Sequence, residues 1–241
     1  MRVQLCTPTY LEADNIEEFL RRTRAAMPSA DILVLDDNSP DGTADIAERV
    51  GYELGQIEVL RRPEKLGLGA AYRAGFAVGI ARGYEVVCQI DADLSHDPEV
   101  LPRLIGAIEE GADLVIGSRY VPGGQIPNWP WRRRALSKYG NLYTGFMLRT
   151  GVHDATAGYR AFRASTLTEI DYAATRAKGY GFQIELTYRV SQHGGTIVEI
   201  PITFTDRVRG HSKMSMAVMA EEMALVTWWG IRDRFRHRPK R

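Results

Sequence analysis

The sequence predicts an α/β protein with a mostly parallel β-sheet flanked by helices. Two observations carry this prediction. Short apolar runs rich in β-branched residues alternate with longer segments of helical spacing through the first 120 residues. Glycines and aspartates of the kind found in turns and caps separate these segments. Such alternation is typical of strand–helix–strand units, whose strands run parallel.

The first half supplies five strands and four helices in turn. The apolar runs predict buried strands over residues 3–6, 32–35, 57–60, 86–90 and 114–116. Helices are predicted over residues 16–27, 44–54 and 100–110, with a further one opened by Gly67-Leu68-Gly69. Asp97 followed by Pro98 is typical of a helix start, where the aspartate caps and the proline takes the first position.

The second half changes character and is richer in loops. A long loop is expected over residues 120–134, which are rich in Gly, Pro, Trp and Arg. The remaining elements are expected as a helix over 135–148, a strand over 157–163, a helix over 182–192, a strand over 196–205 and a helix over 215–236.

Charge and cysteine content exclude several classes of protein. The net charge is +1, yet residues 232–241 alone carry +5, so the rest of the chain is mildly acidic. An acidic body argues against a nucleic-acid-binding protein. The only cysteines, Cys6 and Cys88, lie in apolar runs, which excludes a disulfide framework and favours a cytoplasmic setting. With no apolar stretch of about 18 residues, we expect no membrane-spanning helix.

Acidic residues follow the predicted strands where ligands bind in parallel sheets, at the carboxyl ends. Asp91-Ala92-Asp93 follows one strand, and two carboxylates so spaced can hold Mg²⁺ or Mn²⁺. The alternative is a turn in which the aspartates cap the next helix. A second acidic pair, Asp36-Asp37, favours the metal site, whereas Asp41 is expected to cap the helix that follows it.

Basic residues cluster in the second half. Arg119 follows the fifth strand, Arg132-Arg133-Arg134 follow two tryptophans with Ser137 one turn later, and Arg207 to Lys213 follow the last strand. Guanidinium groups bind phosphates with paired hydrogen bonds. We therefore expect Arg119, Arg207 and Lys213 to bind phosphate; the alternative is a set of solvated loop charges.

Several motifs together resemble a known family. They are Pro8-Thr9-Tyr10-Leu11-Glu12, Asp36-Asp37-Asn38-Ser39-Pro40-Asp41-Gly42-Thr43, Asp91-Ala92-Asp93-Leu94-Ser95-His96-Asp97-Pro98, Gly117-Ser118-Arg119-Tyr120, Gly179-Tyr180-Gly181-Phe182-Gln183 and Asp206-Arg207-Val208-Arg209-Gly210-His211-Ser212-Lys213. In this order they resemble the dolichol-phosphate and polyprenol-monophosphomannose synthases, which are family 2 glycosyltransferases of the GT-A fold. The likeness spans residues 1 to about 215.

The resemblance implies a role for individual residues. Pro8, Tyr10, Glu12, Leu35 and Asp37 would hold the guanosine of GDP-mannose. Asp91 and Asp93 would bind Mg²⁺ or Mn²⁺ against the diphosphate, with Ala92 lining the site. Arg119, Arg133 and Ser137 would meet the lipid phosphate, and Arg207 and Lys213 the donor phosphates. Ser95 stands where some relatives have a glutamine that binds the metal, which leaves its part in the metal site open.

The resemblance also implies a reaction and a domain plan. Mannose would pass from GDP-mannose to a polyprenyl phosphate with inversion. Residues 1–213 would form the catalytic domain, with a nucleotide-binding half over 1–120 and an acceptor half over 121–213. Two other functions remain: transfer of another sugar, such as glucose from UDP-glucose, and a non-catalytic nucleotide-binding regulatory subunit.

The lipid acceptor implies that the protein binds peripherally to the cytoplasmic face of a membrane. Residues 214–241 are expected to form an amphipathic helix and basic tail, with Met216, Met219, Met223, Val226 and Trp229 or Ile231 on its apolar side. Two alternatives remain for this helix: packing against the protein core, and docking on a separate membrane-anchor protein.

Overall fold

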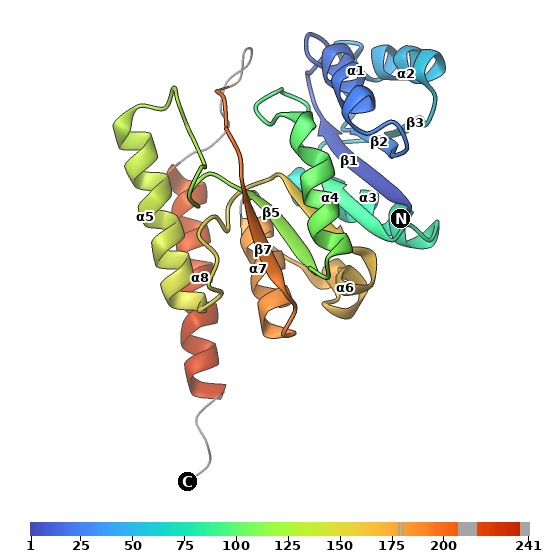
Figure 1. The fold of residues 1–241 in the computed structure, drawn as a ribbon. Coiled ribbons are helices and arrows are strands. Elements are labelled where there is room, and N and C mark those ends of the chain that lie inside the picture. Colours follow the sequence, from blue (N-terminus) through green and yellow to red (C-terminus); the bar gives the residue numbers. More distant parts are fainter. Residues whose placement is uncertain (178, 180, 207–215, 237–241) are drawn as a thin grey trace.

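The chain folds into three layers, with a β-sheet between two layers of helices (Figure 1). This computed structural model describes residues 1–177, 179, 181–206 and 216–236. Within those residues the strands are β1 (Val3–Thr9), β2 (Asp31–Asp36), β3 (Ile57–Arg61), β4 (Val86–Gln89), β5 (Leu114–Ser118), β6 (Arg160–Arg163) and β7 (Ile197–Pro201). The helices are α1 (Ile16–Ala26), α2 (Thr43–Leu54), α3 (Leu68–Ala81), α4 (Leu101–Glu109), α5 (Trp131–Leu148), α6 (Ala164–Glu169), α7 (Gly181–Gln192) and α8 (Met216–Arg236). Short 3₁₀ turns occupy Pro98–Val100 and Tyr172–Ala174.

The predicted mostly parallel sheet is confirmed. Its described strands lie in the order β3-β2-β1-β4-β6-β5-β7. Only β6 among them runs antiparallel to its neighbours, β4 and β5. Strands β1, β2, β4 and β5 therefore point the same way, and their carboxyl ends lie along one edge of the sheet.

The alternation of side chains along the central strands builds two cores. Leu5 of β1 faces the layer of α1, α2 and α4, whereas Cys6 faces the layer of α3, α6 and α7. Both faces of the sheet are covered, which explains why the strands are continuous apolar runs in the sequence.

Four predicted boundaries are wrong by three or four residues. Strand β1 runs to Thr9 and not to residue 6. Helix α5 begins at Trp131, directly after Pro130, and so takes in Arg132–Arg134, which were expected in a loop. The strand expected from residue 157 begins at Arg160, because residues 154–158 form a turn beneath the sheet edge. The last strand ends at Pro201, and beyond it only an isolated bridge joins Thr203 to Gln125.

Helix α8 packs against α5 and α7 at one end of the molecule (Figure 1). Val226 and Trp229 are buried, and the Trp229 ring stacks on Tyr188 of α7 with centroids 5.7 Å apart. The stripe expected to face lipid therefore faces protein at these two positions, because it completes the core beside α7. The Met216 and Met219 side chains lie outside the described residues. Among the helices described, none has the length and apolar character required to cross a bilayer.

Candidate functional site

The carboxyl ends of β1 and β2 bring together the residues predicted to hold a nucleoside. Pro8 pairs with Leu35 across the two strands, and the Asp37 amide donates to the carbonyl of Thr9 at 3.1 Å. Tyr10 and Glu12 follow directly on β1. The side chain of Leu35 is wholly buried in the core, so only its main chain faces this edge.

Two basic residues after β3 join this group, and neither was predicted from the sequence. Arg62 bonds the carboxylate of Asp37, and both side chains are more than nine-tenths buried. Burial raises the pKa of Asp37, and the Arg62 charge opposes that effect. The ammonium of Lys65 lies 3.7 Å from the centroid of the Tyr10 ring, a cation–π contact. The signal available in the sequence was a run of basic residues after the third strand.

The remaining aspartates of this region shape turns. Asp36 accepts hydrogen bonds from the Thr9 hydroxyl at 2.9 Å and the Ser39 hydroxyl at 2.6 Å. Asp41 accepts from the amide and hydroxyl of Thr43, at 3.1 and 2.6 Å, where helix α2 begins. The prediction that Asp41 caps this helix at Ala44 is wrong: Gly42 holds the cap position without a side-chain hydrogen bond, and Asp41 instead closes a turn onto Thr43.

Asp91 and Asp93 follow β4, beside the end of β1. The hydroxyl of Tyr72 donates to Asp91 Oδ1 at 3.3 Å, and burial raises the pKa of that phenol well above its usual range, so it remains a donor. Asp93 is buried, and its Oδ1 accepts from the amide and hydroxyl of Ser95 at 3.1 and 2.6 Å. Ser95 thus fixes the orientation of the Asp93 carboxylate.

The backbone is strained after each of these three strands. Leu11 after β1, Asn38 after β2 and Leu94 after β4 take φ values of 63°, 57° and 60°. Left-handed backbone is uncommon for residues other than glycine, and it gathers at functional sites where the fold enforces it. The three turns that carry Tyr10, Asp37 and Asp93 share this feature.

The carboxylates after β4 fit a divalent cation held partly by substrate. Among the described residues, no group of three or more His, Cys, Asp or Glu side chains is arranged to hold a metal by itself. Mg²⁺ and Mn²⁺ often bind through one or two carboxylates, with water and phosphate oxygens completing the shell. Asp91 and Asp93 offer that incomplete set of oxygen donors.

Arg119 forms an ion pair with a buried carboxylate, that of Asp154. Its Nε and Nη2 donate to the two oxygens of Asp154, each at 2.7 Å, and its amide donates to Asp154 Oδ2 at 2.9 Å. Asp154 is wholly buried, and the Arg119 side chain is 8% exposed. The guanidinium also lies within 5.6 Å of the ring centroids of three aromatic residues: Tyr120, Trp129 and Phe204. A phosphate-binding role for Arg119 stays a prediction.

Arg119 and Arg133 both lie over the ring of Trp129. The guanidinium carbons lie 5.5 and 3.9 Å from its centroid, and Arg133 also donates to Asp206 at 2.9 Å. Ser137 lies one turn further along α5. Arg207 and Lys213 lie outside the described residues.

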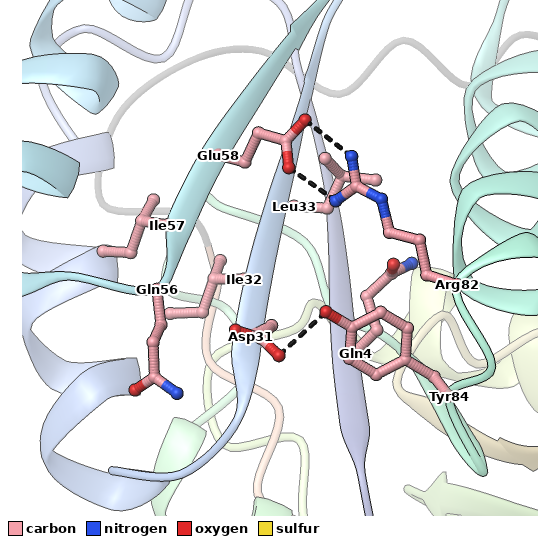
Figure 2. Close-up of a pocket in the computed structure, with 9 residues that line it drawn as sticks. All are labelled: Gln4, Asp31, Ile32, Leu33, Gln56, Ile57, Glu58, Arg82 and Tyr84. Carbon is pink, nitrogen blue, oxygen red and sulfur yellow. Dashed lines mark hydrogen bonds and ion pairs between the residues drawn. The ribbon is translucent and has the colours of Figure 1, made fainter.

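A hollow of about 240 Å³ lies at the opposite edge of the sheet, between the starts of β1, β2 and β3 and the end of α3 (Figure 2). Its charged residues pair within the hollow: Arg82 pairs with Glu58 at 2.5 and 3.0 Å, and Tyr84 donates to Asp31 at 2.8 Å. Ligands of open α/β sheets bind at the carboxyl ends of strands, so this hollow is not the candidate site.

The chain matches Glycosyl transferase family 2 over residues 5–171. It is 51% identical over 234 residues to the polyprenol monophosphomannose synthase of Mycolicibacterium smegmatis, covering 97% of this chain and 88% of that protein. It is 50% identical over 235 residues to the undecaprenyl-phosphate mannosyltransferase of Micrococcus luteus, covering 98% and 96% of the two chains.

Solved structures confirm the expected GT-A fold. Glucosyl-3-phosphoglycerate synthase from Mycobacterium tuberculosis, in complex with Mn²⁺, uridine diphosphate and glucosyl-3-phosphoglycerate, superposes with a TM-score of 0.68. The match covers 97% of this chain and 79% of that one at 20% sequence identity. At that level of identity the likeness concerns the fold alone.

Proposed function

This chain belongs to glycosyl transferase family 2, and from that premise we propose that it transfers mannose from GDP-mannose to a polyprenyl phosphate, releasing GDP. One observation carries the proposal: about half of the residues are shared, over nearly the whole chain, with two enzymes named for this type of transfer. The paired carboxylates at the end of β4 argue for an enzyme and against a regulatory subunit that only binds nucleotide.

The donor would lie along the ends of β2, β1 and β4. Tyr10, with Lys65 over its ring, offers a surface for the base, and the Asp37 carboxylate held by Arg62 offers acceptors for its N–H groups. Pro8, Glu12 and Ala92 line the same edge in this proposal. The diphosphate would then reach Asp91 and Asp93.

A divalent ion, Mg²⁺ or Mn²⁺, would neutralise the charge that develops on the departing diphosphate. Asp91 and Asp93 would hold it, with Tyr72 and Ser95 fixing the two carboxylates. Arg207 and Lys213 would add positive charge near the donor phosphates; their role rests on the sequence motif.

The acceptor phosphate needs little activation by the protein. The second pKa of a phosphate monoester is about 6, so an anionic oxygen is present at neutral pH. Arg119, Arg133 and Ser137 would orient that phosphate from the side of β5 and α5. Attack on the anomeric carbon from the face opposite GDP would invert it and give a β-linked product.

Peripheral association with the cytoplasmic face of a membrane is part of the proposal. Helix α5 exposes a run of large apolar side chains, which we name the α5 apolar face: Trp131, Leu136, Tyr139, Leu142 and Phe146. The neighbouring part of α8 adds Trp228, Ile231 and Phe235. Arg132, Arg232 and Arg234 lie over rings of this surface. Aromatic side chains bordered by cations suit the interface of an anionic bilayer.

The test is a transfer assay with purified protein. It would combine labelled GDP-mannose, UDP-glucose or GDP-glucose with polyprenyl phosphate and Mg²⁺ or Mn²⁺, and score lipid-linked sugar. We expect product from GDP-mannose alone, lost with EDTA and lost in Asp93→Asn, with Asp45→Asn on the surface of α2 as the matched control. Product from UDP-glucose instead would support the alternative donor, and binding of GDP without product would support a regulatory subunit.

A further inference from the structure

Arg160 is the largest of the wholly buried side chains in the described part of the chain, and it lies in none of the family motifs. It opens β6, and its cross-strand partners are Gln89 of β4 and Ile116 of β5. These two neighbours lead directly into Asp91 and Arg119. Arg160 therefore lies in the middle of the sheet, beneath the edge that carries the site.

The guanidinium of Arg160 donates hydrogen bonds to two separate segments, the 154–158 turn and helix α7. Its Nε and Nη2 donate to the carbonyls of Ala157 and Ala155, both at 2.7 Å. Its Nη1 donates to the carbonyl of Gln183 at 2.9 Å and to the hydroxyl of Thr187 at 2.8 Å. The turn over residues 154–158 is thus tied to the first turns of α7 through one planar group.

The turn lies against Asp91, and α7 reaches Asp91 through Tyr72. On the turn, a Cβ added to Gly158 would come 3.5 Å from Asp91 Oδ2. On α7, the Phe182 ring stacks against Tyr72 with centroids 6.2 Å apart, and Tyr72 donates to Asp91 Oδ1. The same turn supplies Asp154, which holds Arg119.

A contribution to stability alone does not explain this residue. The guanidinium forms no ion pair with a carboxylate of the described residues. Burial lowers its pKa to about 9, which the charges of Asp154 and Glu199 only partly oppose and which leaves it charged at neutral pH. Burying such a charge costs free energy that an apolar side chain would not cost. Gln89 is the β4 partner of Arg160, and Gln183 accepts from it through its main chain. The side-chain amides of both glutamines are buried and make no hydrogen bond within the described residues. A core built for stability would not gather these groups.

We propose that Arg160 is a positioning residue for the transfer reaction. Its fork of donors holds the 154–158 turn and α7 at the spacing that sets Asp91 and Arg119 for the donor diphosphate and the acceptor phosphate, without touching either. Lysine, a point charge with a flexible stem, cannot reproduce that fork. This inference rests on the proposed function and adds a residue to its machinery.

The test compares Arg160→Lys with a matched control at the other edge of the sheet. Arg24 likewise donates to several carbonyls, those of Met27, Pro28, Ala30, Gly55 and Gln56. In Arg160→Lys we expect kcat to fall about 10- to 100-fold. The Kd for Mn²⁺ in the presence of GDP, read from the paramagnetic resonance of free Mn²⁺, should rise at least about fivefold, a loss of roughly 1 kcal/mol. In Arg24→Lys both quantities should stay within about twofold, even where the melting temperature falls.

A third readout keeps the inference separable from the proposed function. The Arg119 amide donates to Asp154, so its hydrogen exchange reports the turn directly, with or without metal or activity. We expect exchange at least about tenfold faster in Arg160→Lys. Should that variant fail to fold, Thr187→Val removes one of the four acceptors and should give a smaller defect of the same kind. Unchanged exchange and unchanged Mn²⁺ affinity in the folded variant would overturn the inference; a parent that transfers no mannose would overturn the proposed function instead.

Discussion

Gly158 lies directly against the carboxylate of Asp91, so that a Cβ at this position would come 3.5 Å from Oδ2. That separation is ordinary van der Waals contact, and Ala would fit. Val adds two methyl groups in the same space and would displace either the carboxylate or the turn. We expect Gly158→Val to lower kcat about 100-fold, and Gly158→Ala to stay within about threefold, in the transfer assay. Equal activities for the two variants would contradict this contact between Gly158 and Asp91.

Ser95 fixes a carboxylate that we propose as a metal ligand. Ser95→Ala removes the 2.6 Å hydrogen bond to Asp93 and leaves the backbone donor in place. We expect the Mn²⁺ concentration for half-maximal activity to rise about tenfold, because the carboxylate has lost its hydroxyl donor and is less well oriented for the metal. Ser39→Ala is the control, since Ser39 donates to Asp36 over the same 2.6 Å in a turn without a metal role. A similar rise in the control would show a general loss of structure.

Asp154 is wholly buried and pairs with Arg119, whose side chain is 8% exposed. Removing one partner of a buried pair leaves an uncompensated charge, and Asp154→Ala should lower the free energy of unfolding by about 3–5 kcal/mol. Glu58→Ala breaks the exposed pair with Arg82 and should cost about 0–1 kcal/mol. Urea denaturation of both variants measures the difference, and comparable losses would mean that Arg119 finds another partner.

The α5 apolar face is expected to contact anionic lipid. Phe146 is 72% exposed on this helix. Phe146→Glu should lower the affinity for phosphatidylglycerol vesicles, measured by co-sedimentation, about tenfold. The reason is that burying a phenyl group in the interface is worth roughly 1.5–3 kcal/mol. Tyr52→Glu is the matched control, since Tyr52 is 95% exposed on α2. Vesicle binding that depends equally on both positions, or on neither, would count against this surface.

The two cysteines should be unreactive in the native protein. Burial raises the pKa of the Cys6 thiol to about 12, with a hydrogen bond from Gln4 opposing, and burial also raises the pKa of Cys88. Only the thiolate is nucleophilic. Because pH 8 lies far below the pKa of each thiol, both thiols are protonated. Iodoacetamide should label neither cysteine at pH 8 until guanidinium chloride unfolds the chain, when mass spectrometry should find two labels. Labelling of the folded protein at the rate of a free thiol would contradict the burial.

The sequence predicted the architecture well because the sheet is buried on both faces. Apolar runs flanked by capped helices carry that information locally, and the strand ends then gathered Tyr10, Asp37 and Asp91 at one edge without further assumptions. The predicted ends of strands and helices were wrong where a turn is held by contacts with distant residues. Strand β6, for example, starts three residues later than its composition suggests, since the 154–158 turn is occupied with Asp91 and Arg119.

What the sequence by itself determined is therefore the fold class, the edge of the sheet that carries the chemistry, and the residue types that stand there. The tertiary structure decided the partners. Arg119 meets Asp154 at a sequence separation of 35 residues, and Arg160 reaches Thr187 across 27. Helix periodicity and strand alternation report which way a side chain faces. The charge or carbonyl that it meets is set by how distant segments pack, and no local pattern carries that information.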